Sequence, residues 1–302
     1  MSVSVAYAPN YVHPVPAGHR FPMEKYQLLY EQLRLEGFIP ENQFFAPGKI
    51  ELELVTRVHS PVYLEKLLKL QCSPREQRVS GFEHSDTLIE RELTIMEGTR
   101  MCAELAMETR GVALNIAGGT HHAYSERGEG FCLLNDQAIA AQWLLDQGLV
   151  SRILIVDLDV HQGNGTAQIF DNNPNVFTFS MHGDNNYPLY KEKSDLDVGL
   201  DDGILDIEYL YLLKSSMEQI LKDFTPEIIF FQSGVDIINS DKLGRLGVTL
   251  NGCRKRDEFV FETAKSMNIP VVCTMGGGYS KEIKHIIEAH ANTFKMAVKI
   301  FG

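Results

Sequence analysis

The stretch from Ile153 to Gly165, ILIVDLDVHQGNG, constrains the fold of this chain more than any other. It opens with β-branched and aliphatic residues, which is typical of a strand buried on both faces of a parallel sheet. Asp157, Asp159 and His161 follow at alternate positions, so an extended backbone points all three side chains the same way. Such polar groups at the end of a buried strand are costly unless a cation compensates them. The stretch therefore predicts a parallel sheet with a divalent metal ion at one strand end.

The rest of the chain alternates strand-like and helix-like segments. Apolar runs predict strands over 3–7, 112–116, 153–159, 175–182, 227–234 and 270–278. Helical spacing and capping residues predict helices over 23–36, 61–70, 86–110, 136–147, 166–170, 206–224, 256–267 and 281–300, and residues 183–203 are expected to form a polar loop. This alternation predicts one α/β domain over residues 1–302, with a mostly parallel central sheet and helices on both faces.

Composition excludes several classes of function. A formal net charge of −12 argues against nucleic-acid binding through a surface that matches phosphates, although it is compatible with a basic ligand or protein segment. The five cysteines are scattered and form no CxxC pair, which is typical of a protein in the reducing cytoplasm. The N-terminal residues do not resemble a signal peptide, and no apolar run is long enough to span a bilayer. We expect a cytoplasmic protein without a membrane or nucleic-acid partner.

Ligand sites in open α/β sheets lie beyond the carboxyl ends of the strands. Five predicted strand ends together carry the chemically active residues His121, His122, Asp157, Asp159, His161, His182, Asp236 and Tyr279. An isolated D-x-H sequence is ordinarily a capped strand end with hydrogen-bonded carboxylates. The shared position of all these residues instead favours an active site.

The metal ligands expected from this pattern are Asp159, His161 and Asp236. Three protein ligands with an open position for water are the catalytic arrangement for zinc. Two oxygen ligands and one nitrogen ligand form a harder ligand set than that of most zinc sites. Fe²⁺, Co²⁺ and Mn²⁺ are therefore alternatives to Zn²⁺.

The adjacent histidines His121 and His122 suit acid–base chemistry beside a metal-bound water. One imidazole can accept the proton of the attacking water while the other donates to the leaving group. Asp157 is a natural partner for one ring and Asn164 for the other. Tyr279, which follows three glycines, suits a hydrogen bond to a developing oxyanion, although a packed core tyrosine is the ordinary interpretation of GGGY.

The motifs GGTHHA, GFCLLND, DLDVHQGNGT, SMH, SGVD and GGGY occur in this order. With them and the HRFPMEKY segment, nearly the whole chain resembles the histone deacetylase superfamily of zinc-dependent amidohydrolases, and within it the bacterial or class IV-like branch. The superfamily also includes acetylpolyamine amidohydrolases. The resemblance implies an arginase/deacetylase-like sheet and the hydrolysis of an amide bond.

The resemblance also implies residue roles. Asp159, His161 and Asp236 would bind zinc, His121 and His122 would be the acid–base pair, and Tyr279 would polarise the scissile carbonyl. The substrate channel would be lined by Gly130, Phe131 and Tyr187. The alternative interpretation of the two aromatic residues is that their rings only pack within their loops. Structural potassium would lie at Asp157, Asp159, His161, Ser180 and Met181, and a second potassium at the carbonyls of Phe170, Asn173 and Val176. Many members carry Asp in place of Asn164 and Phe in place of Tyr187.

We therefore expect a metal-dependent hydrolase that removes acetyl or longer acyl groups from lysine side chains. A small acetylated amine such as an acetylpolyamine is the alternative substrate. A catalytically silent binder of acyl groups and an arginase-like hydrolase with two metal ions are rivals of other kinds.

Overall fold

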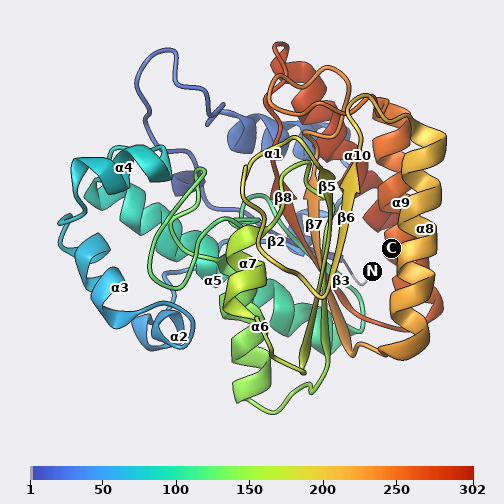
Figure 1. The fold of residues 1–302 in the computed structure, drawn as a ribbon, viewed down its shortest axis with the longest axis horizontal. Helices are drawn as coiled ribbons and strands as arrows, with labels where there is room; N and C mark the ends of the chain where they lie inside the picture. The colour runs from blue at the N-terminus through green and yellow to red at the C-terminus, as the bar shows by residue number, and fades with distance from the viewer. Residues whose placement is uncertain (1–2) are drawn as a thin grey trace.

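The computed structural model describes residues 3–302 (Figure 1). Its centre is one eight-stranded sheet in the order β2-β1-β3-β8-β7-β4-β5-β6. Every neighbouring pair of strands is parallel. The sequence predicted a mostly parallel sheet flanked by helices, and the structure confirms this α/β fold as a single domain.

The strands are β1 (Val3–Ala6), β2 (Phe44–Phe45), β3 (Val112–Asn115), β4 (Ile153–Asp157), β5 (Val176–Gly183), β6 (Leu196–Leu200), β7 (Ile228–Gly234) and β8 (Val271–Gly276). The α-helices are α1 (Lys25–Glu36), α2 (Leu52–Thr56), α3 (Pro61–Leu68), α4 (Pro74–Ser80), α5 (Asp86–Thr109), α6 (Asp136–Asp146), α7 (Asn164–Ile169), α8 (Asp206–Asp223), α9 (Leu250–Ser266) and α10 (Ile283–Phe301). Two short 3-10 helices are η1 (Pro9–Tyr11) and η2 (Glu41–Gln43). Between residues 3 and 302, no helix is long and apolar enough to cross a membrane.

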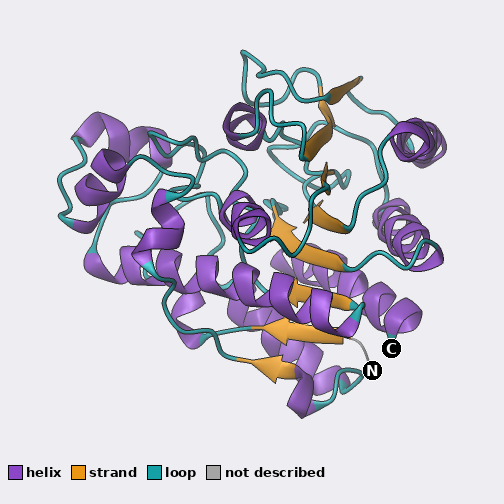
Figure 2. Cartoon of the chain, turned by 90° about the horizontal axis from the view of Figure 1, so that it is seen from below, coloured by secondary structure: helices purple, strands orange, loops and turns teal. Residues whose placement is uncertain are grey.

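Side-chain alternation along the strands gives the sheet two apolar faces. On β4, Ile153 and Ile155 join a cluster with the alanines of α5 and α6. Leu154 and Val156 point the other way, into the cluster that also contains residues of α1, α8, α9 and α10. Figure 2 shows helices on both sides of the sheet. Both faces of β4 are thus buried, as its uninterrupted apolar sequence predicts.

The register of the strands places their polar ends at one level. Asp157 of β4 pairs with Ser180 of β5 and with Gln232 of β7, and Gln232 pairs with Thr274 of β8, which pairs with Asn115 of β3. The segments that follow these five residues therefore leave the sheet at the same edge. The predicted site residues of four strands are brought together by this register.

Several local features differ from the sequence predictions, which contained neither β2 nor α2. The predicted loop 183–203 contains the edge strand β6, whose burial alternates because successive side chains point to opposite faces of the sheet. Helix α9 begins at Leu250 rather than 256, since the Thr249 hydroxyl accepts a hydrogen bond from the Gly252 amide and caps it there. Helix α4 was not predicted, although Ser73 and Glu76 form a capping box at its start.

A buried ion pair fastens α9 beneath the carboxyl edge of the sheet. The Arg256 guanidinium is fully buried and donates to Asp257, and it also donates to the backbone carbonyls of Leu158 and Gly234. The other carboxylate oxygen of Asp257 accepts from the Thr293 hydroxyl of α10. One cation thus joins two helices to the ends of β4 and β7.

We expect Arg256→Met to destabilise the fold by about 3–5 kcal/mol, because it leaves the Asp257 carboxylate buried without its partner. Urea unfolding followed by circular dichroism measures the change. Lys255→Met is the control, since the neighbouring Lys255 side chain is exposed on the same helix. Equal stability of the two variants would contradict this account of the ion pair.

Candidate metal and catalytic site

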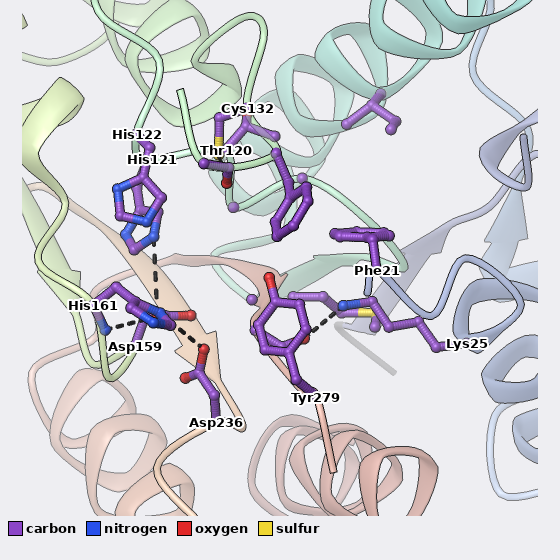
Figure 3. A pocket seen from close by; sticks show the side chains of 18 of the residues that line it. Phe21, Lys25, Thr120, His121, His122, Cys132, Asp159, His161, Asp236 and Tyr279 are labelled. Carbon is purple, nitrogen blue, oxygen red and sulfur yellow. Dashed lines mark hydrogen bonds and ion pairs between the residues drawn. The ribbon is translucent and has the colours of Figure 1, made fainter. Parts of the chain in front are cut away.

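Asp159, His161 and Asp236 meet at the carboxyl edge of the sheet, as the sequence predicted. One ligand atom from each lies within 4.8 Å of the others, and this is the only such group of metal-binding side chains found among residues 3–302. The His161 Nδ1 atom lies 3.0 Å from the Asp159 Oδ1 and 3.2 Å from the Asp236 Oδ2 (Figure 3). Both carboxylates are buried, and only 11% of the His161 side chain is exposed.

The electrostatics of this triad fit a bound cation. The buried Asp236 Oδ2 lies 3.2 Å from the His161 Nδ1 but forms no well-aligned hydrogen bond with any residue from 3 to 302. Burial and the charge of Asp159 raise the pKa of Asp236. Burial opposes ionisation of Asp159, but its hydrogen bond with His161 holds the pKa of Asp159 below its usual value. A divalent cation would compensate both carboxylates and use the free oxygen, so the three residues are suited to hold a metal ion.

The tandem histidines lie beside the triad and have chemically different partners. The His121 Nδ1 is 2.6 Å from a carboxylate oxygen of Asp157, and the His122 Nδ1 is 2.6 Å from the amide oxygen of Asn164. Burial lowers the pKa of His121, but the Asp157 charge outweighs it and raises the pKa to about 8. Burial and the neighbouring imidazoles hold the pKa of His122 well below its usual value. The carboxylate favours an imidazolium at His121, whereas His122 stays neutral.

A polar chain fixes the orientation of Asn164. Its amide nitrogen donates to the Tyr124 hydroxyl at 3.0 Å, and that hydroxyl donates to Glu192 at 3.1 Å. The amide oxygen is therefore left to accept from the His122 Nδ1–H, so the unprotonated Nε2 of His122 is the free acceptor. The sequence pattern pointed to Asn164 but not to Tyr124, which follows His122 in the same loop, or to Glu192, which lies in the loop before β6.

Tyr279 projects into the pocket across from the triad and the histidines (Figure 3). Its backbone amide donates to the Asp241 carboxylate, which also accepts from two other backbone amides of its own loop. Burial and the charge of Asp236 raise the pKa of the Tyr279 phenol. The phenol therefore keeps its proton and is suited to donate a hydrogen bond.

The pocket is a narrow cavity of about 40 Å³, continuous with the metal triad. Phe131 lies in its wall with ring centroids 6.0 Å from Tyr279 and 5.3 Å from Phe21. Tyr187 stands at the mouth, 5.0 Å from the His122 ring, and its hydroxyl donates to Glu129. Gly130 lies so close to His122 that a Cβ there would be 2.7 Å from the ring. The structure brings the three predicted channel residues together.

Sequence reasoning missed Phe21 and Lys25, which also line this pocket. The buried Lys25 ammonium donates to the carbonyl of Gly277 and lies 4.6 Å from the Phe21 ring centroid. Both residues belong to the HRFPMEKY segment, so the motif was visible but the roles were not. They reach the site from α1 and the loop before it, which no strand-end argument covers.

Other predicted residues lie near the site without lining the pocket. Asp157 and Ser180 are paired across β4 and β5, and Met181 follows, so the residues expected at the first potassium site are neighbours. Phe170, Asn173 and Val176 form one turn, in which backbone hydrogen bonds link 173 to 170 and 176 to 173. His182 points elsewhere: its Nδ1 contacts the Ser180 hydroxyl at 2.9 Å, and it is not among the pocket residues.

Comparisons with known proteins give the family of the chain and its fold. The sequence profile of the histone deacetylase domain matches residues 19–294. An uncharacterised protein of Picosynechococcus sp. is 42% identical over the full length of both chains, and Histone deacetylase 2 of Arabidopsis thaliana is 32% identical over 94% of this chain and 76% of its own. The fold matches the crystal structure of an HDAC homologue complexed with SAHA, with a TM-score of 0.83 and 22% identity over 98% of this chain and 84% of that one. The chain therefore belongs to the histone deacetylase family.

Proposed function

We propose that this protein is a zinc-dependent hydrolase that removes acetyl or longer acyl groups from lysine side chains. The observation that supports this proposal most directly is that the Asp159–His161–Asp236 triad, two buried histidines and the Tyr279 phenol face one narrow pocket. A narrow pocket of this kind suits a slender chain such as an acylated lysine. A small acetylated amine is the alternative substrate, and the residues at the pocket mouth bear on that choice.

The triad would hold Zn²⁺, with Fe²⁺ or Co²⁺ as alternatives for the same ligand set. Bound there, the ion would polarise the substrate carbonyl and lower the pKa of a water molecule. Structural K⁺ is proposed for the group Asp157, Asp159, His161, Ser180 and Met181. The five cysteines, all unbridged, support a reducing compartment such as the cytoplasm.

The two histidines would divide the proton transfers according to their partners. His122, paired with the neutral amide of Asn164, accepts the proton of the attacking water at its free Nε2. His121, paired with the Asp157 carboxylate, holds a proton and donates it toward the leaving amine. Different partners thus adapt adjacent, identical side chains to opposite tasks.

Tyr279 would stabilise the negative charge that develops on the scissile carbonyl oxygen. Its backbone is fixed by Asp241 and its ring is packed beside Phe131, so the hydroxyl is oriented before substrate arrives. Such preorganised donors contribute more in a buried pocket than in water.

Three variants test the proposal together. We expect Asp159→Ala to lose both bound metal and amide hydrolysis, and His122→Ala to keep metal but lose hydrolysis. Tyr279→Phe should keep metal while kcat falls about 10²–10³-fold, the usual effect of removing one oxyanion donor. Metal content by mass spectrometry and hydrolysis of an acetyl-lysine peptide are the measurements. Tyr190→Phe is the control, because Tyr190 is 92% exposed. Full metal content and activity in Asp159→Ala would refute the proposal.

We expect Gly277→Ala to abolish metal binding. Gly277 has φ 54°, and an added Cβ would lie 1.9 Å from the Asp236 Oδ2, which pushes this ligand out of place. Gly148→Ala is a matched control, since Gly148 has φ 63° but open space around it. Both variants should lose about 1 kcal/mol from backbone strain. Only Gly277→Ala should lose metal, which isothermal titration with Zn²⁺ measures, and equal zinc affinity in both would contradict the assigned ligand geometry.

We expect Asn164→Asp to move the acidic limb of the pH profile of kcat/KM to higher pH. A carboxylate beside His122 favours the imidazolium and raises its pKa by roughly one unit or more. The base works only when neutral, so higher pH is then needed to deprotonate it. Asn251→Asp adds the same charge at an exposed position of α9 and should leave the limb in place. An unmoved limb in Asn164→Asp would show that His122 is not the base.

A further inference from the structure

A second cavity, of about 410 Å³, lies at the mouth of the pocket and shares His122, Phe131 and Tyr279 with it. Apart from site histidines, the charged residues that line it are Arg20, Arg78 and Arg245. No Asp or Glu of the described chain lines it, although the sequence holds 40 acidic residues against 28 basic ones. The mouth is therefore locally basic on an acidic protein.

Two of these arginines are free to bind a ligand. Arg245 pairs with Asp202 at 3.5 Å, whereas Arg20 and Arg78 are exposed, and their side chains have no hydrogen bond or ion pair with any residue from 3 to 302. Most other arginines do have an acidic partner, as in the Arg57–Asp146 and Arg100–Glu97 pairs. Glu83 lines an adjoining outer cavity with both arginines, and Glu24 lines a further cavity with Arg20, but neither glutamate pairs with them.

The fold holds the two arginines on the same side of the mouth. The His19 ring bonds to the carbonyl of Gly81 at 2.9 Å, which ties the loop that carries Arg20 to the end of helix α4, which carries Arg78. His19 also stacks on Phe82, with ring centroids 5.5 Å apart. The arrangement is built from loop-to-helix contacts rather than from two chance surface residues.

The position of the arginines decides which part of a substrate they meet. The reacting carbonyl must lie beside Tyr279 and the metal triad, deep in the narrow pocket. Arg20 and Arg78 line the outer cavity and not the inner one. Phe131 lines both cavities and so lies between the arginines and the reacting groups. The arginines therefore face the amine side of the substrate, where the peptide that carries the lysine emerges. Leu189, 85% exposed on the same rim, offers that peptide an apolar contact.

We propose that Arg20 and Arg78 bind carboxylates of Asp or Glu residues next to the acylated lysine, so that the enzyme selects acyl-lysine in acidic protein segments. This inference rests on the proposed deacylase function. Guanidinium groups pair with carboxylates through two parallel hydrogen bonds, which suits such a contact. The same arginines repel an acetylpolyamine, because its remaining amines are cationic at neutral pH.

The test compares acetyl-lysine peptides of one length that carry Asp, Gln or Lys on both sides of the modified residue, together with N-acetylspermidine. We expect kcat/KM to fall in the order Asp, Gln, Lys, with the Asp peptide about tenfold above the Gln peptide at low salt, as two partly exposed ion pairs would give. The preference should shrink as salt is added. N-acetylspermidine should be the poorest substrate.

The variants assign the preference to the two residues. In Arg20→Gln/Arg78→Gln, the ratio between the Asp and Gln peptides should approach one while turnover of the Gln peptide stays unchanged. Lys222→Gln removes an exposed charge at the end of α8, on the opposite edge of the sheet, and should keep the ratio. Thermal unfolding verifies that the variants are folded.

Each outcome bears on one proposal at a time. Three results would overturn the inference and leave the proposed hydrolase function intact. They are equal turnover of all peptides, a preference for the Asp peptide that survives in the double variant, and better turnover of N-acetylspermidine than of the peptides. A preference for succinyl-lysine in the Gln peptide over acetyl-lysine in the Asp peptide would place the anion on the acyl group and also overturn it. If no peptide is hydrolysed, fluorescence anisotropy measures whether peptides still bind. Selective binding of the Asp peptide without turnover would refute the proposed hydrolase function but support the arginine contact.

Discussion

The structure depends on the compensation of two buried carboxylates, Asp159 and Asp236, which share a single imidazole. Each follows the end of a central strand. Asp159 accepts from the His161 backbone amide, and Asp236 accepts from the Val160 amide through one oxygen only. Arg256 lies directly behind them and holds the carbonyls of the residues next to the strand ends, Leu158 and Gly234. The backbone beneath the carboxylates is thereby fixed, so a cation in front of them meets a preformed set of ligands.

The two histidines illustrate how a fold assigns roles to identical side chains. Their rings are 4.1 Å apart, so the protonation of one disfavours the protonation of the other. An acid beside His121 and an amide beside His122 break this symmetry. Because Tyr124 holds the Asn164 amide in one orientation, the tautomer of His122 is set by hydrogen bonds rather than by charge.

The sequence predicted the centre of the site better than its surroundings, for a physical reason. In a parallel sheet all carboxyl ends meet at one edge, so Asp159, Asp236 and Tyr279 could be grouped from strand positions alone. Lys25 could not be found this way, since it reaches the pocket from a helix outside the sheet. The edge strand β6 was missed because its LDVGL sequence is paired on one side only and lacks the apolar run of a central strand.

Net charge is a weak guide to a ligand, because an electrostatic field at a binding site is local. A formal charge of −12 is compatible with a basic partner, yet screening in physiological salt limits the reach of each exposed charge to about 8 Å. Within that reach of the pocket mouth, unpaired guanidinium groups count for more than distant carboxylates. An acidic residue that is already paired, as Asp202 is with Arg245, contributes even less to the field that a ligand meets at the pocket mouth. A partner is therefore better predicted from the unpaired charges around a cavity than from the sum over the chain.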